Sequence, residues 1–138
     1  MKIEILEQPP DSIIAAIEEQ ISREPNSSIT TIRPEWMGEI YDFSYTAAII
    51  NNEAAAIALI RWPNPNVAEL YKLVVIKRFR KAGVGKKLAY SAIDRCRREG
   101  FNSVMIQPTN NSENFWEITL KEFNFKVYEH NDVIDITL

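Results

Sequence analysis

Two glycines separated by one residue, Gly83 and Gly85, end the stretch Arg80-Lys81-Ala82-Gly83-Val84-Gly85, and this pattern favours the binding of phosphate groups. Glycine carries no side chain that would keep a ligand away from the backbone. A helix that begins at such a turn directs free N–H groups and the positive end of its dipole at an anion. The stretch therefore predicts a cradle for the diphosphate of a nucleotide-like cofactor.

The elements on either side of this turn must position it. An apolar run at residues 70–76 predicts a strand that leads into the turn. Residues 84–99 predict an amphipathic helix that leaves it, and Gly100 is a natural stop for that helix. The apolar positions that share one helical face are Val84, Leu88, Ala89, Ala92, Ile93 and Cys96. The strand–turn–helix context is what makes the two glycines informative.

Two other glycine-containing motifs do not match the sequence of this turn. A P-loop requires glycine where Arg80 stands and serine or threonine where Lys87 stands. A dinucleotide fingerprint requires glycine or alanine where Leu88 stands, and an acidic residue at the end of the next strand, where Gln107 and Pro108 stand. Neither motif describes this turn.

The rest of the chain predicts alternating helices and strands. We expect strands at residues 2–6, 41–50, 54–62, 67–76, 103–107, 125–129 and 133–137. We expect further helices after Asp11, with Ile13, Ile14, Ile17 and Ile21 at helical spacing, and at residues 112–123. Asn51-Asn52 predicts a hairpin turn, and residues 25–40 are irregular.

Composition limits the classes of function. The 138 residues, 46% of them hydrophobic and 25% charged, suit one compact domain. No apolar stretch approaches the roughly 20 residues of a membrane span, and no secretion signal is evident, so we expect a cytoplasmic protein. The sequence has one cysteine, Cys96, which we expect in the core, and one histidine, His130, which we expect in a turn. We therefore expect no disulfide and no metal site.

The basic residues cluster around the glycine turn. Residues 77–98 hold nine of the 16 lysines and arginines but one of the 19 acidic residues. Such a patch suits nucleic acid or a phosphorylated cofactor. Because Arg80, Lys81 and Lys86 flank the glycines, we favour the cofactor over nucleic acid; Arg95, Arg97 and Arg98 are expected to form a solvated helix face.

At the glycine turn the chain resembles the GNAT superfamily of acyl-CoA-dependent N-acetyltransferases. The motif of that family, Gln/Arg-x-x-Gly-x-Gly/Ala between its fourth strand and third helix, is satisfied by residues 80–85. The match is closest over residues 68–88, and the order of elements agrees over nearly the whole chain. The resemblance implies one α/β (α+β) domain over residues 1–138, with a mixed, mostly antiparallel sheet of about seven strands, flanked by helices and splayed between strands 4 and 5.

The resemblance also implies the activity, which is transfer of an acetyl group from acetyl-CoA to a primary amine by direct attack in a ternary complex. Backbone N–H groups of the turn would bind the pyrophosphate, and the fourth strand would pair with the pantetheine arm. The cofactor-binding residues so implied are Leu73, Val74, Val75, Arg80, Lys81, Ala82, Gly83, Val84, Gly85 and Lys86.

Glu69 is the candidate catalytic base, because it lies eleven residues before Arg80, where histone-acetylating members of the family carry their glutamate. Strand alternation is expected to place Glu69, Tyr71, Leu73 and Val75 on one side of the sheet. The Leu73 N–H is the candidate donor that polarises the thioester carbonyl. The alternative for Glu69 is an exposed strand carboxylate paired with a nearby lysine.

The chain departs from the family at the general acid. Leu120 stands where many members carry a tyrosine, and a longer helix would place Phe115-Trp116 there instead. Tyr71, Tyr128 or solvent would then protonate the thiolate. This departure keeps open an alternative function, a CoA-binding regulatory module with little or no turnover.

The acceptor is predicted from charge alone. Acidic residues favour a cationic amine such as a polyamine, a lysine or a protein N-terminus, so a small molecule and a peptide both remain candidates. The acidic residues are Glu35, Glu39, Asp42 and Glu69. Trp36 and Trp62 either wall the acceptor pocket or pack in the core. The sequence leaves a homodimer open.

Overall fold

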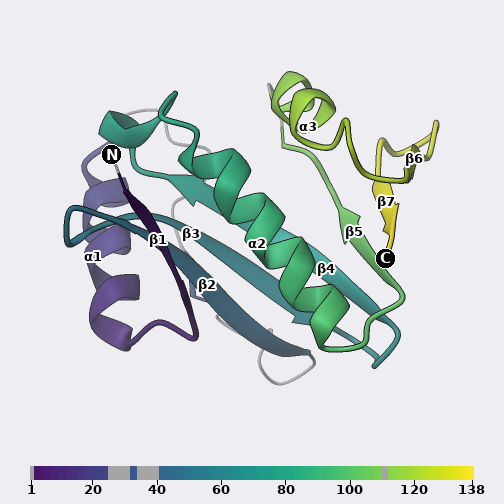
Figure 1. The fold of residues 1–138 in the computed structure, drawn as a ribbon, viewed down its shortest axis with the longest axis horizontal. Coiled ribbons are helices and arrows are strands. Elements are labelled where there is room, and N and C mark those ends of the chain that lie inside the picture. Colours follow the sequence, from purple (N-terminus) through teal and green to yellow (C-terminus); the bar gives the residue numbers. More distant parts are fainter. Residues whose placement is uncertain (1, 25–31, 34–40, 110–111) are drawn as a thin grey trace.

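The computed structural model describes residues 2–24, 32–33, 41–109 and 112–138, which build one seven-stranded sheet (Figure 1). The strand order is β1-β2-β3-β4-β5-β7-β6, and β4–β5 is the parallel pair among antiparallel neighbours. The strands are β1 (Ile3–Glu7), β2 (Asp42–Ile50), β3 (Glu53–Trp62), β4 (Val67–Val75), β5 (Ser103–Ile106), β6 (Phe125–Val127) and β7 (Ile134–Thr137). The predicted mixed, mostly antiparallel sheet is confirmed.

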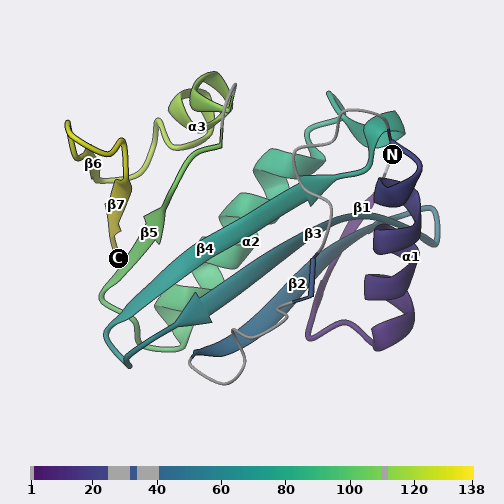
Figure 2. The same ribbon diagram turned by 180° about the vertical axis from the view of Figure 1, so that it is seen from behind.

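Helices cover both faces of the sheet. Helix α1 (Asp11–Ser22) packs on one face and α2 (Val84–Arg98) on the other, as the two opposite views show (Figures 1 and 2). α1 buries Ile14, Ile17 and Ile21, as its spacing predicted. The short helix α3 (Glu113–Thr119) follows β5, and a 3-10 turn, η2 (Lys77–Phe79), follows β4. In the ranges given above, no helix is long and apolar enough to cross a membrane.

The apolar face of α2 packs on the sheet as predicted, and Cys96 is in the core. Arg95 contradicts the prediction of a solvated face, since the residue is only 3% exposed. Its Nη1 donates to the Tyr45 carbonyl at 2.8 Å and to Thr46 Oγ1 at 3.1 Å, and its Nε donates to Glu99 at 3.1 Å. These acceptors satisfy the guanidinium, which is the condition for burying a charge.

The turns at Asn51-Asn52 and His130 lie where the sequence predicts them, but one helix is shorter than predicted. Asn51 and Asn52 both have positive φ, 50° and 65°, as a two-residue hairpin turn requires. His130 lies in a turn. The helix expected to reach Phe123 instead ends at Thr119, because the Phe123 N–H bonds to Leu120, three residues back, in a tighter turn.

The sheet splits between β4 and β5, as predicted. The two strands pair from Val67 to Leu70 with Ser103 to Ile106. Beyond this point β4 continues to Val75 beside β3, whereas β5 ends at Ile106 and the chain after it leads away from β4 (Figure 2). Within the described part of the chain, no second strand pairs with residues 71–75, so one edge of β4 is open there.

Candidate functional site

The turn after β4 exposes unpartnered amides at the start of α2. Lys81 and Gly83 both adopt left-handed conformations, with φ of 70° and 80°, and Gly83 is the N-terminal cap of α2. The Lys87 N–H donates to the Gly83 carbonyl at 3.1 Å, which is the first bond of the helical ladder. The N–H groups of residues 84–86 therefore have no acceptor one turn back and can bind an anion.

The two glycines serve different purposes. A Cβ atom on Gly83 would meet no atom within 4 Å, so this glycine is needed for its positive φ and leaves the space above it open. A Cβ atom on Gly85 would lie 3.2 Å from Phe115 Cε1 and 3.4 Å from Val75 Cγ2. Gly85 therefore allows the start of α2 to approach β4 and α3 closely.

The basic residues of the turn are not equivalent. Lys81 and Lys86 are exposed beside the helix start. The Arg80 side chain is instead held by the protein, with Nε donating to the Val75 carbonyl at 3.0 Å and Nη2 to Glu24 at 2.9 Å. The Arg80 N–H also donates to the Lys77 carbonyl at 3.2 Å, so the available amides of the turn begin after Arg80.

The open edge of β4 presents backbone groups of Leu73 and Val75. The Ile76 N–H donates to the β3 residue Ala55 at 2.8 Å. Successive residues of a strand direct their N–H and C=O groups to opposite edges, so those of Leu73 and Val75 face away from β3. Those of Val74 face β3, and its side chain packs in the cluster beneath α1. The Val75 carbonyl already accepts from Arg80 Nε, so an extended ligand could pair with the Leu73 backbone and the Val75 N–H.

A β-bulge changes which face the β4 side chains occupy. The pairing with β3 skips Tyr71, and this extra residue reverses the alternation that follows it. Leu70 lies in the cluster beneath α2, and Leu73 and Val75 pack against that same cluster. Glu69 therefore points to the opposite face, and the prediction that it shares a side with Leu73 and Val75 was wrong.

Glu69 is held by Arg61 on the neighbouring strand. Arg61 Nε and Nη2 donate to the two carboxylate oxygens at 3.0 and 3.3 Å, and the side chains are 15% and 28% exposed. The Arg61 guanidinium also lies over the Tyr71 ring at 3.7 Å and the Tyr41 ring at 4.7 Å. The partner of Glu69 is thus an arginine fixed by two aromatic rings, not the lysine considered from the sequence.

The other aromatic candidates lie in different settings. Leu120, which directly follows α3, is fully buried and has no hydroxyl to donate a proton. Tyr128 donates its hydroxyl to Asp135 at 3.2 Å, at the end of β6 and three strands away from β4 in the sheet order. Trp62 packs on Phe101 with ring centroids 5.6 Å apart. Trp36, Glu35 and Glu39 lie outside the described residues, and Asp42 is exposed at the start of β2.

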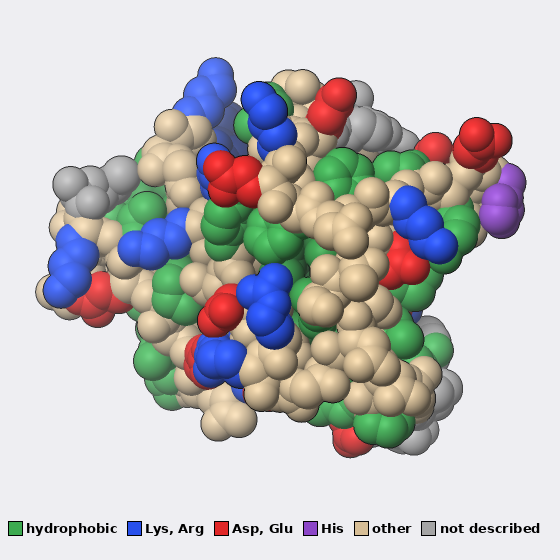
Figure 3. Space-filling model, turned by 45° about the vertical axis from the view of Figure 1, so that its right-hand side comes forward, with side chains coloured by type: hydrophobic (Ala, Val, Ile, Leu, Met, Phe, Trp, Pro, Cys, Tyr) green, Lys and Arg blue, Asp and Glu red, His purple; other side chains and the backbone are tan. Residues whose placement is uncertain are grey.

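Charges on the surface alternate in sign. Lys and Arg side chains are interspersed with Asp and Glu on the face seen in Figure 3. Arg97 and Arg98 of α2 form ion pairs with Asp94 one turn away. This alternation gives little support to a continuous nucleic-acid-binding stripe. Among the residues that the structure describes, no group of three potential ligands could hold a metal ion.

Sequence reasoning missed Arg61 and Glu24, which hold Glu69 and Arg80. Arg61 and Glu69 are 8 positions apart on neighbouring strands, whereas Glu24 and Arg80 are 56 positions apart. Arg61 could have been found, because the hairpin register predicts which β3 residue faces Glu69. Glu24 gave no comparable signal.

Comparison with known proteins agrees with the predicted resemblance. The model of the acetyltransferase (GNAT) family matches residues 13–120. No curated protein sequence matches the chain. Similar solved structures include the PaiA N-acetyltransferase of Thermoplasma acidophilum in complex with coenzyme A, with a TM-score of 0.71 and 16% identity over 99% of both chains.

Two further structures show the same fold. Ard1 of Thermoplasma volcanium has a TM-score of 0.65 and 18% identity, covering 100% of this chain and 99% of that chain. The ribosomal-protein-S18-alanine N-acetyltransferase of Escherichia coli has a TM-score of 0.66 and 16% identity, covering 98% and 90%. At these identities the likeness concerns the fold.

Proposed function

The chain belongs to the GNAT acetyltransferase family, and from this premise we propose that residues 1–138 form one domain that transfers an acetyl group from acetyl-CoA to a primary amine. The observation that carries the proposal is the pairing of an anion-binding helix start with an open strand edge. The free amides of residues 84–86 and the open edge of β4 follow one another along the chain. Together they match a ligand with a diphosphate and an extended arm.

The residues present fit coenzyme A. The space above Gly83 is open, and the exposed Lys81 and Lys86 add positive charge beside the amides at the start of α2. An amide-containing pantetheine arm can hydrogen bond to the Leu73 backbone and the Val75 N–H like an added strand. The backbone groups of Val74 face β3 and its side chain is buried, so we propose that Val74 supports the strand and does not contact the cofactor.

Acetyl-CoA supplies an activated acetyl group as a thioester. The Leu73 N–H at the open edge would hydrogen bond to the carbonyl oxygen, where negative charge grows as the amine attacks. Glu69, on the opposite face of β4, would accept a proton from the amine as its new bond to carbon forms and the bond from carbon to sulfur breaks. We propose that solvent protonates the thiolate, because a thiol with a pKa near 8.5 is a good leaving group at neutral pH.

The acceptor is proposed to be a primary amine. Two acidic residues that suggested a cationic acceptor lie outside the described residues, and Arg61 balances the charge of Glu69. The described residues therefore support an amine as the acceptor. They give less support to an acceptor that carries an additional positive charge. Tyr71 and Phe43, each more than a third exposed near Arg61, could contact the acceptor's carbon skeleton.

Acetyl transfer to a panel of amines tests the proposal directly. The panel should include polyamines, lysine, peptides with free N-termini and neutral amines, with release of CoA thiol as the readout. We expect turnover with at least one primary amine and a loss of about 10²-fold or more in kcat for Glu69→Gln. Glu122→Gln, at an exposed position near the end of α3, is the control that should keep wild-type kcat.

The outcomes separate the two functions that the sequence left open. Equal kcat values for wild type and Glu69→Gln would remove Glu69 from the mechanism. CoA binding without transfer to any amine would contradict the enzyme and favour a regulatory module. The buried Leu120, where a tyrosine is often found, is the observation that keeps this second function in view.

A further inference from the structure

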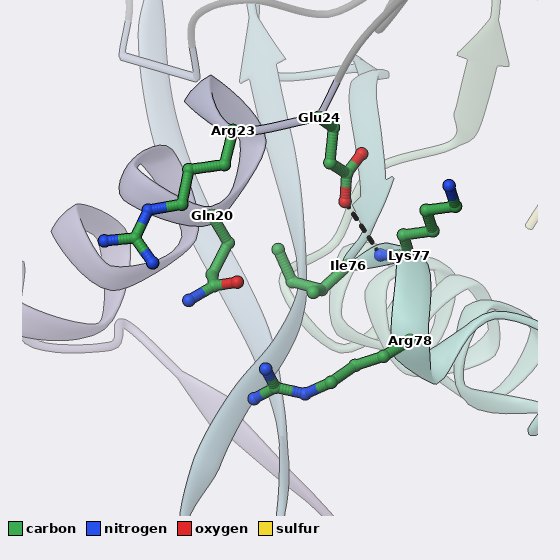
Figure 4. Close-up of a pocket in the computed structure, with 6 residues that line it drawn as sticks. All are labelled: Gln20, Arg23, Glu24, Ile76, Lys77 and Arg78. Atoms are coloured by element: carbon green, nitrogen blue, oxygen red, sulfur yellow. Dashed lines mark hydrogen bonds between the residues drawn. The ribbon is translucent and has the colours of Figure 1, made fainter.

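Glu24 lies just after α1 and contacts the turn that follows β4. Its carboxylate accepts a hydrogen bond from the Lys77 N–H at 2.8 Å and from Arg80 Nη2 at 2.9 Å, and the side chain is 12% exposed. Figure 4 shows the carboxylate turned toward the Lys77 backbone nitrogen. One side chain from the α1 side of the fold thus holds the turn at two points.

Arg80 extends this connection to the strand. Its Nε donates to the carbonyl of Val75, the last residue of β4. The chain of contacts runs from Glu24 through Arg80 to Val75, and a direct bond runs from Glu24 to the backbone of Lys77. Hydrogen bonds between charged groups are among the stronger ones in proteins, so this clamp restrains both ends of residues 75–80.

The turn needs such a restraint because part of it is strained. Lys81 adopts a φ of 70°, a left-handed conformation that is unfavourable for a residue with a Cβ atom. Strained conformations persist when the surrounding structure fixes them, and they are frequent where a ligand is held. Lys81 follows Arg80 directly, so the Glu24–Arg80 contact fixes the chain as it enters the strained residue.

We propose that Glu24 is a positioning residue that preorganises the diphosphate cradle for coenzyme A. The inference rests on the proposed function, since it concerns the same cofactor. Glu24 itself would not touch the diphosphate, because a carboxylate beside it would repel the ligand. Its effect on CoA affinity would pass through Arg80 and the backbone of the turn.

The surroundings of Glu24 allow its side chain to be substituted without disturbing the hydrophobic core. It borders a cavity of about 480 Å³ (Figure 4). The cavity is lined by Gln20, Arg23, Glu24, Ile76, Lys77 and Arg78. A neutral or shorter side chain at position 24 would therefore meet open space and polar groups, and we expect the variants to fold.

Calorimetric titration with CoA tests this inference. Glu24→Gln removes the charge and keeps the shape, and Glu24→Asp keeps the charge but shortens its reach. We expect each to weaken CoA binding by about five- to twenty-fold, since one charge-assisted contact is lost. The control is Glu19→Gln, which lies on α1 in an exposed ion pair with Arg23 and should bind CoA as wild type does.

A double-mutant cycle distinguishes positioning from general loosening. If Glu24 acts through Arg80, the loss in the Glu24→Gln/Arg80→Gln double variant should be clearly smaller than the product of the two single losses. Wild-type affinity in both Glu24 variants, or purely multiplicative losses, would overturn the inference while leaving the proposed function intact. Absence of CoA binding by the wild-type protein would overturn both.

Discussion

Gly83→Ala has two expected effects that can be measured separately, a loss of CoA affinity and a loss of stability. A Cβ atom at position 83 would meet no neighbour within 4 Å, so the added methyl group causes no clash in the free protein. The cost comes from φ, which is 80° and is unfavourable for alanine by about 1–2 kcal/mol. Reduced freedom of the unfolded chain offsets about 0.4–1 kcal/mol, so we expect a net loss of about 1 kcal/mol.

Gly100 provides a matched control. Its φ is 94°, and a Cβ atom there would also meet nothing within 4 Å, but it lies past the other end of α2, roughly 20 Å from the cradle. Gly100→Ala should therefore lose a similar amount of stability and keep its CoA affinity. Gly83→Ala should lose about tenfold or more in CoA affinity, because its methyl group fills the space proposed for phosphate.

The two quantities are measured separately. Urea denaturation gives the free energy of unfolding of each variant, and calorimetry gives its dissociation constant for CoA. Gly83→Val should bind CoA more weakly still, since a branched side chain reaches further into the same space. Equal CoA affinity for the folded Gly83→Ala and Gly100→Ala variants would refute the placement of the diphosphate at this turn.

Three further predictions concern residues away from the cradle. Arg95→Ala should lower the free energy of unfolding by about 2 kcal/mol, because it removes the charged donor to the buried Thr46 hydroxyl and one of the two donors to the Tyr45 carbonyl, which keeps its bond from the Gln8 N–H. The exposed Arg97→Ala should change it by less than about 0.5 kcal/mol in the same denaturation experiment. Burial raises the pKa of Cys96 to about 12, so a thiol reagent at pH 8 should label it only after unfolding; labelling of the native protein would contradict its position in the core. Because this pKa is higher in the folded than in the unfolded protein, the unfolding free energy should fall as pH rises from about 9 toward 12, and Cys96→Ala should show a smaller fall.

Local patterns in the sequence predicted the elements well. The spacing of Ile14, Ile17 and Ile21 and the apolar face of α2 gave both main helices. Asn51-Asn52 gave the hairpin. The position of Gly83 correctly predicted the first residue of α2. These signals are local, because helix periodicity and turn chemistry depend on neighbours a few residues apart.

Other features depended on contacts that local patterns do not encode. The bulge at Tyr71 reversed the faces of Leu73 and Val75, since one unpaired residue changes every later side chain in the strand. The burial of Arg95 depends on acceptors from β2, about 50 positions earlier. A charged residue near the end of an amphipathic helix is usually solvated, and its sequence neighbours gave no sign of these partners.

The most direct test of the account compares two acyl donors. Acetyl-CoA and S-acetylpantetheine share the thioester and the extended arm, but S-acetylpantetheine lacks the diphosphate and the nucleotide. Titration of the wild-type protein should give saturable binding of acetyl-CoA and at least about 100-fold weaker binding of S-acetylpantetheine. Equal affinities for the two compounds, or no saturable binding of acetyl-CoA, would contradict the assignment of residues 81–86 as a diphosphate cradle.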